Sequence, residues 1–296
     1  MNISIFVCVA VGLFGLCLGS FAGALVWRLR AKQLLKDKSD IEMSRSEKNE
    51  YKRLKKLTRA SLLNDRSQCL DCSYQLKWYD LIPLFSWVVL KGRCRKCHEK
   101  IGYLEPMLEV GVAVFFILSY ILWPYPLDST ISILRLLVWM ISGVGLAIVF
   151  VYDLKWFLIP NRVNFTIIGI GLINILLILF SSTNKIDVLL NIVGASIILS
   201  GLYYVIYLIS NGKWIGFGDI KLGLGLSFLL ADWKLAFIAL FAANFIGCLV
   251  VIPSMITGKL KRDSRIPFGP LLIIGFVIAG LVGTYLIDVY MSILLI

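Results

Sequence analysis

Charged residues are scarce in this sequence. Lys, Arg, Asp and Glu make up 16% of its 296 residues, whereas hydrophobic residues make up 59%. Soluble domains carry about 25% charged residues, so this composition excludes a soluble globular protein. The hydrophobic runs also lack the alternating polar positions of a transmembrane barrel strand, which leaves helices as the elements that cross the membrane.

Apolar runs that qualify as membrane helices recur along the chain. A span needs roughly 20 apolar residues, and the candidates, of which the sixth is short, lie near 3–27, 105–123, 131–152, 163–180, 187–209, 219–231, 234–256 and 267–287. No basic residue precedes the first run, and charge begins only at Arg28, so this run is not typical of a cleavable signal peptide. The predicted fold class is an all-α polytopic membrane protein with about eight transmembrane helices.

Basic residues lie almost entirely on one side of these spans. Residues 28–100 and the loops 153–162, 211–221 and 257–266 hold 27 of the 30 Lys and Arg residues. By the positive-inside rule this side is cytoplasmic, which places both termini outside. Anionic lipid beside an anchored basic loop explains the charge more simply than nucleic acid does. We therefore expect membrane lipid as a partner and no nucleic acid.

Four of the seven cysteines form two CxxC pairs. They are Cys69, Cys72, Cys94 and Cys97. The separation of the pairs is close to that of zinc ribbons, whereas disulfides are disfavoured because a cytoplasmic segment keeps its thiols reduced. We predict structural zinc held by four thiolates, which leaves no open position on the metal for catalysis. His98, the sole histidine, is then an exposed surface residue.

The remainder of the polar insert, residues 30–68, is rich in charge. Tyr51, Leu54 and Leu62 lie within it at helical spacing and form a thin apolar stripe on a basic helix. Such a helix either lies on the membrane surface or belongs to a solvated, partly disordered linker.

Two aspartates stand at the edges of apolar runs, both on the predicted cytoplasmic side. Asp153 ends the third run and Asp219 begins the short sixth one. The dipole of a helix disfavours a carboxylate at its C-terminal end by about 0.3–1 kcal/mol, so another interaction should retain Asp153. Each also has a structural explanation, because Asp219 is a good N-cap and Asp153 has Lys155 and Arg162 nearby for an ion pair. Ionisable residues at a membrane face together favour a functional site.

Residues that break or re-aim the backbone surround both aspartates. Gly216 and Gly218 permit close approach beside Asp219, and Pro160 re-aims the chain after the first aspartate. Two adjacent carboxyls share one proton, so one can activate a water while the other donates a proton to the carbonyl oxygen or to the leaving amine. This pattern predicts peptide hydrolysis without a metal. Lys221 would favour the charged state of one carboxyl if it lies close to the pair.

These stretches resemble a known family. "GFGDIKL" is similar to the GxGD motif of membrane aspartyl peptidases, and "YDLKWFLIPN" is similar to the first aspartate motif of type IV prepilin leader peptidases/N-methyltransferases. "GSFAGALVWRL" (19–29) resembles the end of that family's first span. Residues 69–101, with their WYD, IP and SW elements, resemble its tetracysteine segment. The matching stretches follow the family's order from residue 19 to residue 222.

The resemblance implies an enzyme that cuts the leader of type IV prepilins or pseudopilins at the cytoplasmic face of the bacterial inner membrane. Asp153 and Asp219 match its catalytic aspartates, and the four cysteines match its zinc ligands. Bifunctional members then methylate the new N-terminus with S-adenosylmethionine. The residues that would bind this methyl donor are unknown.

The sequence departs from the family pattern at two places. Residues 30–68 exceed the usual link, and Leu104, Glu105 and Pro106 stand where members often have Arg-Tyr-Pro, with Glu109 retained. No nucleotide-binding fingerprint occurs in a strand–loop–helix setting. Methyl transfer is therefore implied by the resemblance alone.

These observations divide the chain into three parts: a first transmembrane span (1–27), a basic insert with the tetracysteine zinc site (28–103), and a multi-span aspartyl peptidase core (104–296). The alternative to a peptidase is an ion- or proton-coupled transporter that uses the two interfacial aspartates. A zinc-ribbon scaffold for partner proteins is a third option. Leader cleavage that depends on the aspartates would separate the enzyme from both.

Overall fold

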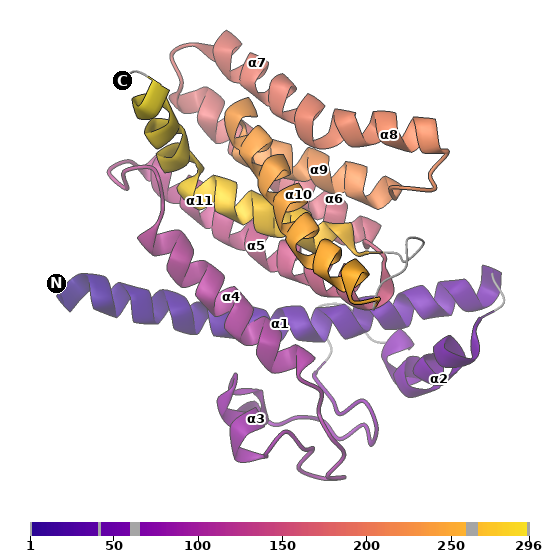
Figure 1. The fold of residues 1–296 in the computed structure, drawn as a ribbon. Helices are drawn as coiled ribbons and strands as arrows, with labels where there is room; N and C mark the ends of the chain where they lie inside the picture. The colour runs from indigo at the N-terminus through magenta and orange to yellow at the C-terminus, as the bar shows by residue number, and fades with distance from the viewer. Residues whose placement is uncertain (1, 41–42, 60–65, 259–265, 295–296) are drawn as a thin grey trace. The chain divides into compact units, whose positions relative to one another are not determined.

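The computed structural model describes residues 2–40, 43–59, 66–258 and 266–294. Within these residues the chain is helical, with two isolated antiparallel bridges and no strand. Seven of the described helical segments are long and apolar enough to cross a membrane, and each predicted run coincides with a helical segment (Figure 1). The predicted all-α polytopic membrane fold is confirmed.

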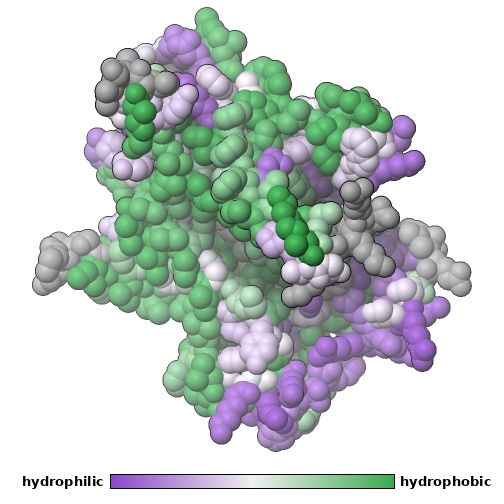
Figure 2. Space-filling model, viewed as in Figure 1, coloured by the Kyte–Doolittle hydropathy of each residue, from purple (hydrophilic) through white to green (hydrophobic). Residues whose placement is uncertain are grey.

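Contacts divide the chain into two compact units, residues 1–117 and 118–296. The first holds α1 (Asn2–Asp40), α2 (Arg45–Leu54), η1 (Lys55–Arg59), η2 (Trp78–Leu81), α3 (Phe85–Val89) and most of α4 (Leu104–Ile121). The second holds α5 (Thr130–Trp156), α6 (Asn161–Ser181), α7 (Lys185–Ser196), η3 (Ile197–Gly201), α8 (Leu202–Ser210), α9 (Phe217–Leu230), α10 (Trp233–Ile256) and α11 (Phe268–Leu294). Figure 2 shows hydrophobic side chains over the long helices and hydrophilic ones gathered over α2.

Small residues bring α1 and α4 together in the first unit. A Cβ atom on Gly19 would lie 2.6 Å from Glu109 Cα, and one on Gly15 would lie 2.8 Å from Ala113 Cα. Glycines four residues apart therefore let the two backbones approach closely, which is how membrane helices gain packing energy.

The first helix is longer than predicted, because α1 continues past residue 27 to Asp40. Leu34 in this extension is fully buried in a cluster with Leu54, and Tyr51 packs against the same cluster. The predicted apolar stripe of the basic segment therefore packs against α1. Burial of this apolar surface removes it from water and stabilises the folded state. Leu62 lies outside the described residues.

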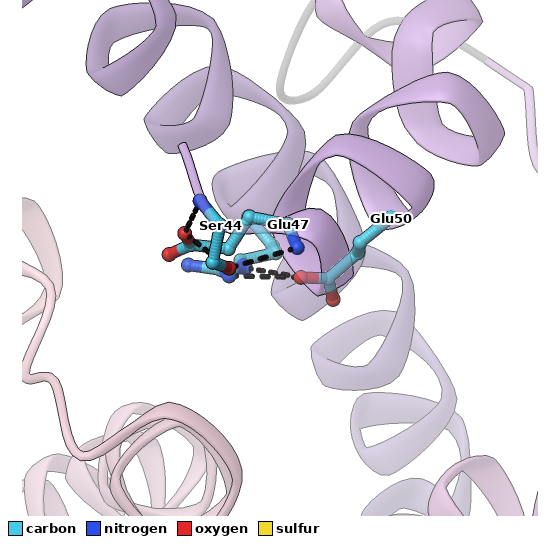
Figure 3. A network of polar contacts seen from close by, with 4 residues as sticks. Ser44, Glu47 and Glu50 are labelled. Atoms are coloured by element: carbon cyan, nitrogen blue, oxygen red, sulfur yellow. Dashed lines mark hydrogen bonds and ion pairs between the residues drawn. The ribbon is translucent and has the colours of Figure 1, made fainter. Parts of the chain in front are cut away.

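Polar contacts fix the beginning of α2 beside α1. Ser44 and Glu47 form a capping box at the start of α2, which satisfies backbone N–H groups that have no partner within the helix. The buried guanidinium of Arg30 on α1 donates to Glu50 Oε2 at 2.8 and 3.0 Å (Figure 3). A buried charge requires such a partner, so this pair sets how α2 docks.

The short helix α9 is packed closely within the second unit. It lies beside α6 and η3 (Figure 1), and a Cβ atom on Gly223 would lie 2.0 Å from the Leu199 carbonyl oxygen. Its 14 residues extend only about 21 Å, less than the roughly 30 Å of a hydrocarbon core. For this reason the sixth predicted run is not among the seven candidate spans.

Two asparagines of α6 hold the ends of α9. Asn164 Nδ2 donates to the Gly218 carbonyl at 3.0 Å, and Asn174 Nδ2 donates to the carbonyls of Phe228 and Leu229 at 3.1 and 3.0 Å. Both helices therefore run in the same direction. Because Asn164 binds the first turn of α9, it also fixes the residue that follows Gly218.

Candidate active site

Asp153 is held at the end of α5 by the beginning of α11. Its carboxyl is buried, and Oδ2 accepts a hydrogen bond from the Gly269 backbone N–H at 2.8 Å. The first N–H groups of a helix have no partner within it and carry its positive end. The sequence predicted that some interaction offsets the unfavourable helix dipole at Asp153. The hydrogen bond from α11 is that interaction.

Glycine and a left-handed turn permit this contact. A Cβ atom at Gly269 would lie 2.9 Å from Asp153 Oδ2, so a side chain at position 269 would displace the carboxyl from the N–H group. Phe157 adopts a left-handed φ of 53° and its N–H donates to the Asp153 carbonyl, which ends α5 one turn after the aspartate.

Asp219 lies in the first turn of α9, where the positive end of a helix favours a carboxylate. Gly216, and not Asp219, occupies the N-cap position, and a Cβ atom on Gly216 would lie 3.2 Å from Asp219 Oδ2. Asp219 Oδ1 is buried without a hydrogen-bond partner among the described residues. The carboxyl also interacts electrostatically with Asp153, so the structure brings the two predicted aspartates together.

The loop between α5 and α6 packs against the glycine that precedes Asp219. Pro160 is the N-cap residue of α6. A Cβ atom on Gly218 would lie 3.1 Å from the Cβ atom of Ile159, so glycine allows this loop to lie directly on α9. The close contact joins the segment that follows Asp153 to the segment that carries Asp219.

Lys221 has a different partner from the one expected. Its amine donates to Asn161 Oδ1 at 3.0 Å and lies 5.2 and 5.0 Å from the ring centroids of Phe165 and Phe217. Lys221 therefore joins α9 to α6, whereas the charged neighbour that acts on Asp219 is Asp153.

Tyr203 is a residue near Asp219 that was not predicted from the sequence. This tyrosine on α8 is 4% exposed, and its hydroxyl lies beside the side-chain amide of Asn244 without a well-aligned hydrogen bond. It interacts electrostatically with Asp219, and its ring meets that of Phe268 edge-on at 5.2 Å. The only signal in the sequence was a hydroxyl within an apolar run, which does not separate Tyr203 from the adjacent Tyr204.

A cluster of four thiols lies in the first unit. The Sγ atoms of Cys69, Cys72, Cys94 and Cys97 all lie within 4.8 Å of one another, and none of these residues forms a disulfide. The Sγ–Sγ distance is 3.8 Å between Cys69 and Cys97 and 3.9 Å between Cys72 and Cys94. Metal–sulfur bonds of about 2.3 Å in a tetrahedron place the sulfurs about 3.8 Å apart. The cluster therefore fits a four-coordinate metal ion.

Both CxxC pairs have the same backbone form. The N–H of Ser73 donates to the Cys69 carbonyl and that of His98 donates to the Cys94 carbonyl, each at 3.0 Å. Ser73 and His98 both adopt left-handed φ values, 59° and 56°. His98 is exposed, as predicted, and its contribution here is the turn that brings the cysteine thiols inward.

Ion pairs connect the cysteine cluster to its surroundings. Arg95 donates to the buried Asp80 on η2 at 2.8 Å, and Arg53 on α2 forms two hydrogen bonds of 2.8 Å with Asp71. The Arg95–Asp80 ion pair connects the Cys94–Cys97 turn to η2. The Arg53–Asp71 ion pair connects the Cys69–Cys72 turn to α2. Such paired contacts to a carboxylate favour one geometry.

Comparison with known proteins identifies the family. Residues 13–123 match the bacterial peptidase A24 N-terminal domain, and residues 140–252 match the type IV leader peptidase family. The four cysteines fall within the first match and both aspartates fall within the second. No solved structure matches the chain.

Curated relatives cover nearly the whole chain. It is 30% identical to a prepilin leader peptidase/N-methyltransferase of Pectobacterium carotovorum subsp. carotovorum, over 90% of each chain. It is 29% identical to one of Legionella pneumophila over 99% of this chain and 97% of the relative, and 25% identical to one of Pseudomonas aeruginosa over 95% and 92%. The chain therefore belongs to the type IV leader peptidase family, whose members are multi-pass proteins of the inner membrane.

Proposed function

We propose that this protein is a membrane aspartyl endopeptidase that cleaves the leader of type IV prepilin-like proteins and then methylates the new N-terminus. One observation carries the peptidase proposal: the carboxyl of Asp153, at the end of α5, and that of Asp219, at the beginning of α9, lie within electrostatic range of each other. The names of the relatives agree with this activity, and the ion-coupled transporter gains no support from them.

The two carboxyls differ in a way that divides the acid and base roles. Gly269 N–H donates to Asp153 Oδ2, and such a bond stabilises a charged oxygen, so Asp153 takes the proton from an attacking water. Asp219 carries the shared proton and donates it to the carbonyl oxygen of the scissile bond. As the tetrahedral diol collapses, Asp153 gives its proton to the leaving amine and Asp219 recovers a proton from the diol hydroxyl whose oxygen re-forms the carbonyl. The pair then returns to its starting state.

Tyr203 and the glycines prepare the site for an extended substrate. We assign Tyr203, which interacts electrostatically with Asp219 but forms no hydrogen bond with it in this structure, as the donor to Asp219 Oδ1 in the substrate complex. Gly216 leaves room for a substrate backbone at the beginning of α9, whereas Gly218 lets Ile159 hold the loop that follows Asp153 against α9. A peptide bond must leave its helix to be attacked, so the site accepts the junction between the leader and the apolar helix of the substrate.

The active site and the cysteine cluster both belong on the cytoplasmic side. The loops that contain or adjoin them hold 27 of the 30 basic residues of the chain, and basic loops remain in the cytoplasm. Prepilin-like substrates offer a basic leader on that side and an apolar segment in the bilayer. Asp219 at the beginning of α9 lies at the depth where these two parts join.

Zinc is the metal that the cysteine cluster holds in this proposal. Four thiolates at tetrahedral spacing are typical of structural zinc, and Cys69, Cys72, Cys94 and Cys97 would occupy every coordination position. The ion stabilises the two turns of the insert and takes no part in hydrolysis. S-adenosylmethionine would supply the methyl group, but no described residue is assigned to it and no step of that reaction is derived.

The test uses the purified protein in lipid vesicles with a synthetic leader-plus-helix peptide, with and without S-adenosylmethionine. Mass spectrometry should show loss of the leader in both cases and one added methyl group only with the donor. Cleavage without methylation would support the proposed peptidase activity and contradict the proposed methyltransferase activity.

Asp153→Asn and Asp219→Asn are the decisive variants. Asparagine keeps the shape of the side chain but cannot carry the proton, so each variant should insert into the membrane and lose cleavage. Near-normal cleavage by either variant would overturn the paired-aspartate mechanism.

A further inference from the structure

The short helix α3 presents apolar side chains outside the predicted spans. Phe85, Val88 and Val89 are 63%, 63% and 57% exposed, and Trp78 on the preceding turn is 77% exposed. Figure 2 shows this hydrophobic surface beside the hydrophilic surface of the cysteine turns. A contiguous exposed apolar patch indicates an interaction surface.

A hydrogen bond fixes the depth of α3 relative to α4. Leu84, just before α3, donates its N–H to Glu109 Oε2 at 2.8 Å. Glu109 lies five residues into α4, about 7.5 Å along the helix axis. The 18 residues of α4 span only about 27 Å, so the whole helix is needed to cross a hydrocarbon core of roughly 30 Å. The beginning of α4 must then lie at the edge of that core and Glu109 about 7.5 Å inside it, so α3 lies in the layer where interfacial apolar segments insert.

Further contacts hold α3 in this orientation. Leu84 has a left-handed φ of 58°, an unfavourable conformation for leucine that the Glu109 contact helps to retain. The ring of Trp87 packs against Tyr103, just before α4, with centroids 5.5 Å apart. The exposure of Phe85 and Val88 is thus a fixed property of the insert.

The surroundings of α3 match a membrane surface. Met107 and Val110 near the beginning of α4 are also exposed, at 71% and 44%, as expected where this helix faces lipid. On the other side, the exposed cations Lys91, Arg93 and Lys96 follow α3 in the chain. Apolar side chains followed by cations are the pattern of a segment that lies in the interface of an anionic membrane.

We propose that α3 is a lipid anchor of the metal-binding insert. Phe85, Val88 and Val89 lie at the boundary between headgroups and acyl chains, and Lys91, directly after this segment, contacts anionic headgroups. The anchor holds the insert against the bilayer surface next to the first turns of α4. This proposal rests on α4 as a membrane helix and is independent of the peptidase assignment.

Photocrosslinking tests the anchor in the full-length protein. Phe85 is replaced by p-benzoylphenylalanine, and the protein is reconstituted in vesicles of phosphatidylethanolamine and phosphatidylglycerol and irradiated. Mass spectrometry should find a phospholipid adduct on the peptide that contains position 85. The same replacement at Lys96, also exposed but in the cysteine turn, should give none, and replacement at Met107 should give an adduct as the positive control.

Absence of a lipid adduct at position 85 while position 107 forms one would overturn the proposal. So would an adduct that forms only with an added prepilin-like peptide, because the surface would then bind substrate. Hydrogen exchange gives a second readout: in vesicles, Val88→Asp should speed exchange of the amides of residues 85–90, whereas Lys96→Asp should not. Equal exchange in the two variants would also contradict the anchor.

Discussion

Asp153 and Asp219 are supported by different groups. Asp153 accepts a backbone N–H from α11, whereas Asp219 keeps a buried oxygen that has no hydrogen-bond partner within the described residues. The Tyr203 hydroxyl, beside Asn244, forms no well-aligned hydrogen bond and interacts electrostatically with Asp219. An unsatisfied buried donor beside an unsatisfied buried acceptor is costly in a resting protein, and such groups are typical of sites that await substrate or water.

Tyr203→Phe should lower kcat for leader cleavage without loss of the fold. The variant removes one hydrogen-bond donor, with a net value of about 0.5–1.5 kcal/mol, which corresponds to roughly a three- to tenfold lower rate. Because the hydroxyl acts through Asp219, the pH profile of kcat should move while KM stays the same. Cleavage of a fixed peptide across a pH series measures both quantities.

Tyr204→Phe is the matched control for this variant. Tyr204 is the next residue on α8 but is 44% exposed on the surface of its unit, so removal of its hydroxyl should leave cleavage unchanged. If the two variants have the same kcat and the same pH profile, Tyr203 has only a packing role.

Gly218→Leu should impair cleavage although both aspartates remain. A Cβ atom at Gly218 would already lie 3.1 Å from the Ile159 side chain, so the larger side chain must push the α5–α6 loop away from α9. Such a shift at a catalytic site can lower the rate about 100-fold. The measurement is the initial rate of leader removal in vesicles.

Gly169→Leu provides the comparison, because a Cβ atom there meets nothing within 4 Å. It should fold and cleave normally. Full activity in Gly218→Leu would mean that the close approach at α9 is unnecessary for the reaction.

Among the elements, the cysteine turns are the ones whose own packing contributes least to their stability. Between residues 66 and 103 the described chain has isolated bridges, short turns and the five-residue α3, which bury little apolar surface. A bound metal supplies folding free energy in such segments. The insert therefore differs from the helical units, which are stabilised by their own packing.

Purified, reduced protein should contain about one zinc ion per chain, measured by atomic emission. Cys72→Ser should lose the metal and make residues 66–103 sensitive to limited proteolysis, whereas Cys248→Ser, at an exposed position on α10, should keep both metal and resistance. Leader cleavage should not stop at once on chelation. Zinc retained in Cys72→Ser would mean that the four thiols are not the ligands.

For the whole molecule, the short helix α9 decides on which side the C-terminus lies. It runs in the same direction as α6, because Asn164 and Asn174 bind its two ends in order. The turn after α9 reaches α7, where a Cβ atom on Gly194 would lie 2.9 Å from the Trp233 side chain. We therefore expect α9 to count as a crossing in spite of its length.

Reporter fusions test this topology. With α9 as an eighth crossing, both termini lie outside the cytoplasm, so alkaline phosphatase fused to the C-terminus should be active. The same enzyme inserted in the loop 211–216 should be inactive. Activity at the loop, or an inactive C-terminal fusion, would contradict the predicted sidedness.

The sequence alone determined the membrane class and the helical segments, and it predicted the residues that carry the chemistry. Apolar runs and scarce charge are local properties, and a helix satisfies its own backbone without reference to the rest of the chain. The CxxC pairs and the two aspartates were visible because ionisable or thiol residues stand out against apolar surroundings. The extension of α1 and its packing with Tyr51 could not be predicted. The many charged residues in 28–40 mask the few apolar positions on the face of α1 that packs against another helix.

Only the tertiary structure decided which groups meet these residues. Gly269 contacts Asp153 across 116 positions of sequence, Lys221 turns to Asn161, and Tyr203 reaches the site from a helix that looks uniformly apolar. Each of these contacts depends on how helices pack, and packing follows from close approach at glycines and from side-chain shape over the whole unit. A local pattern carries no record of that arrangement, so the sequence could identify the aspartates but not the groups that hold them.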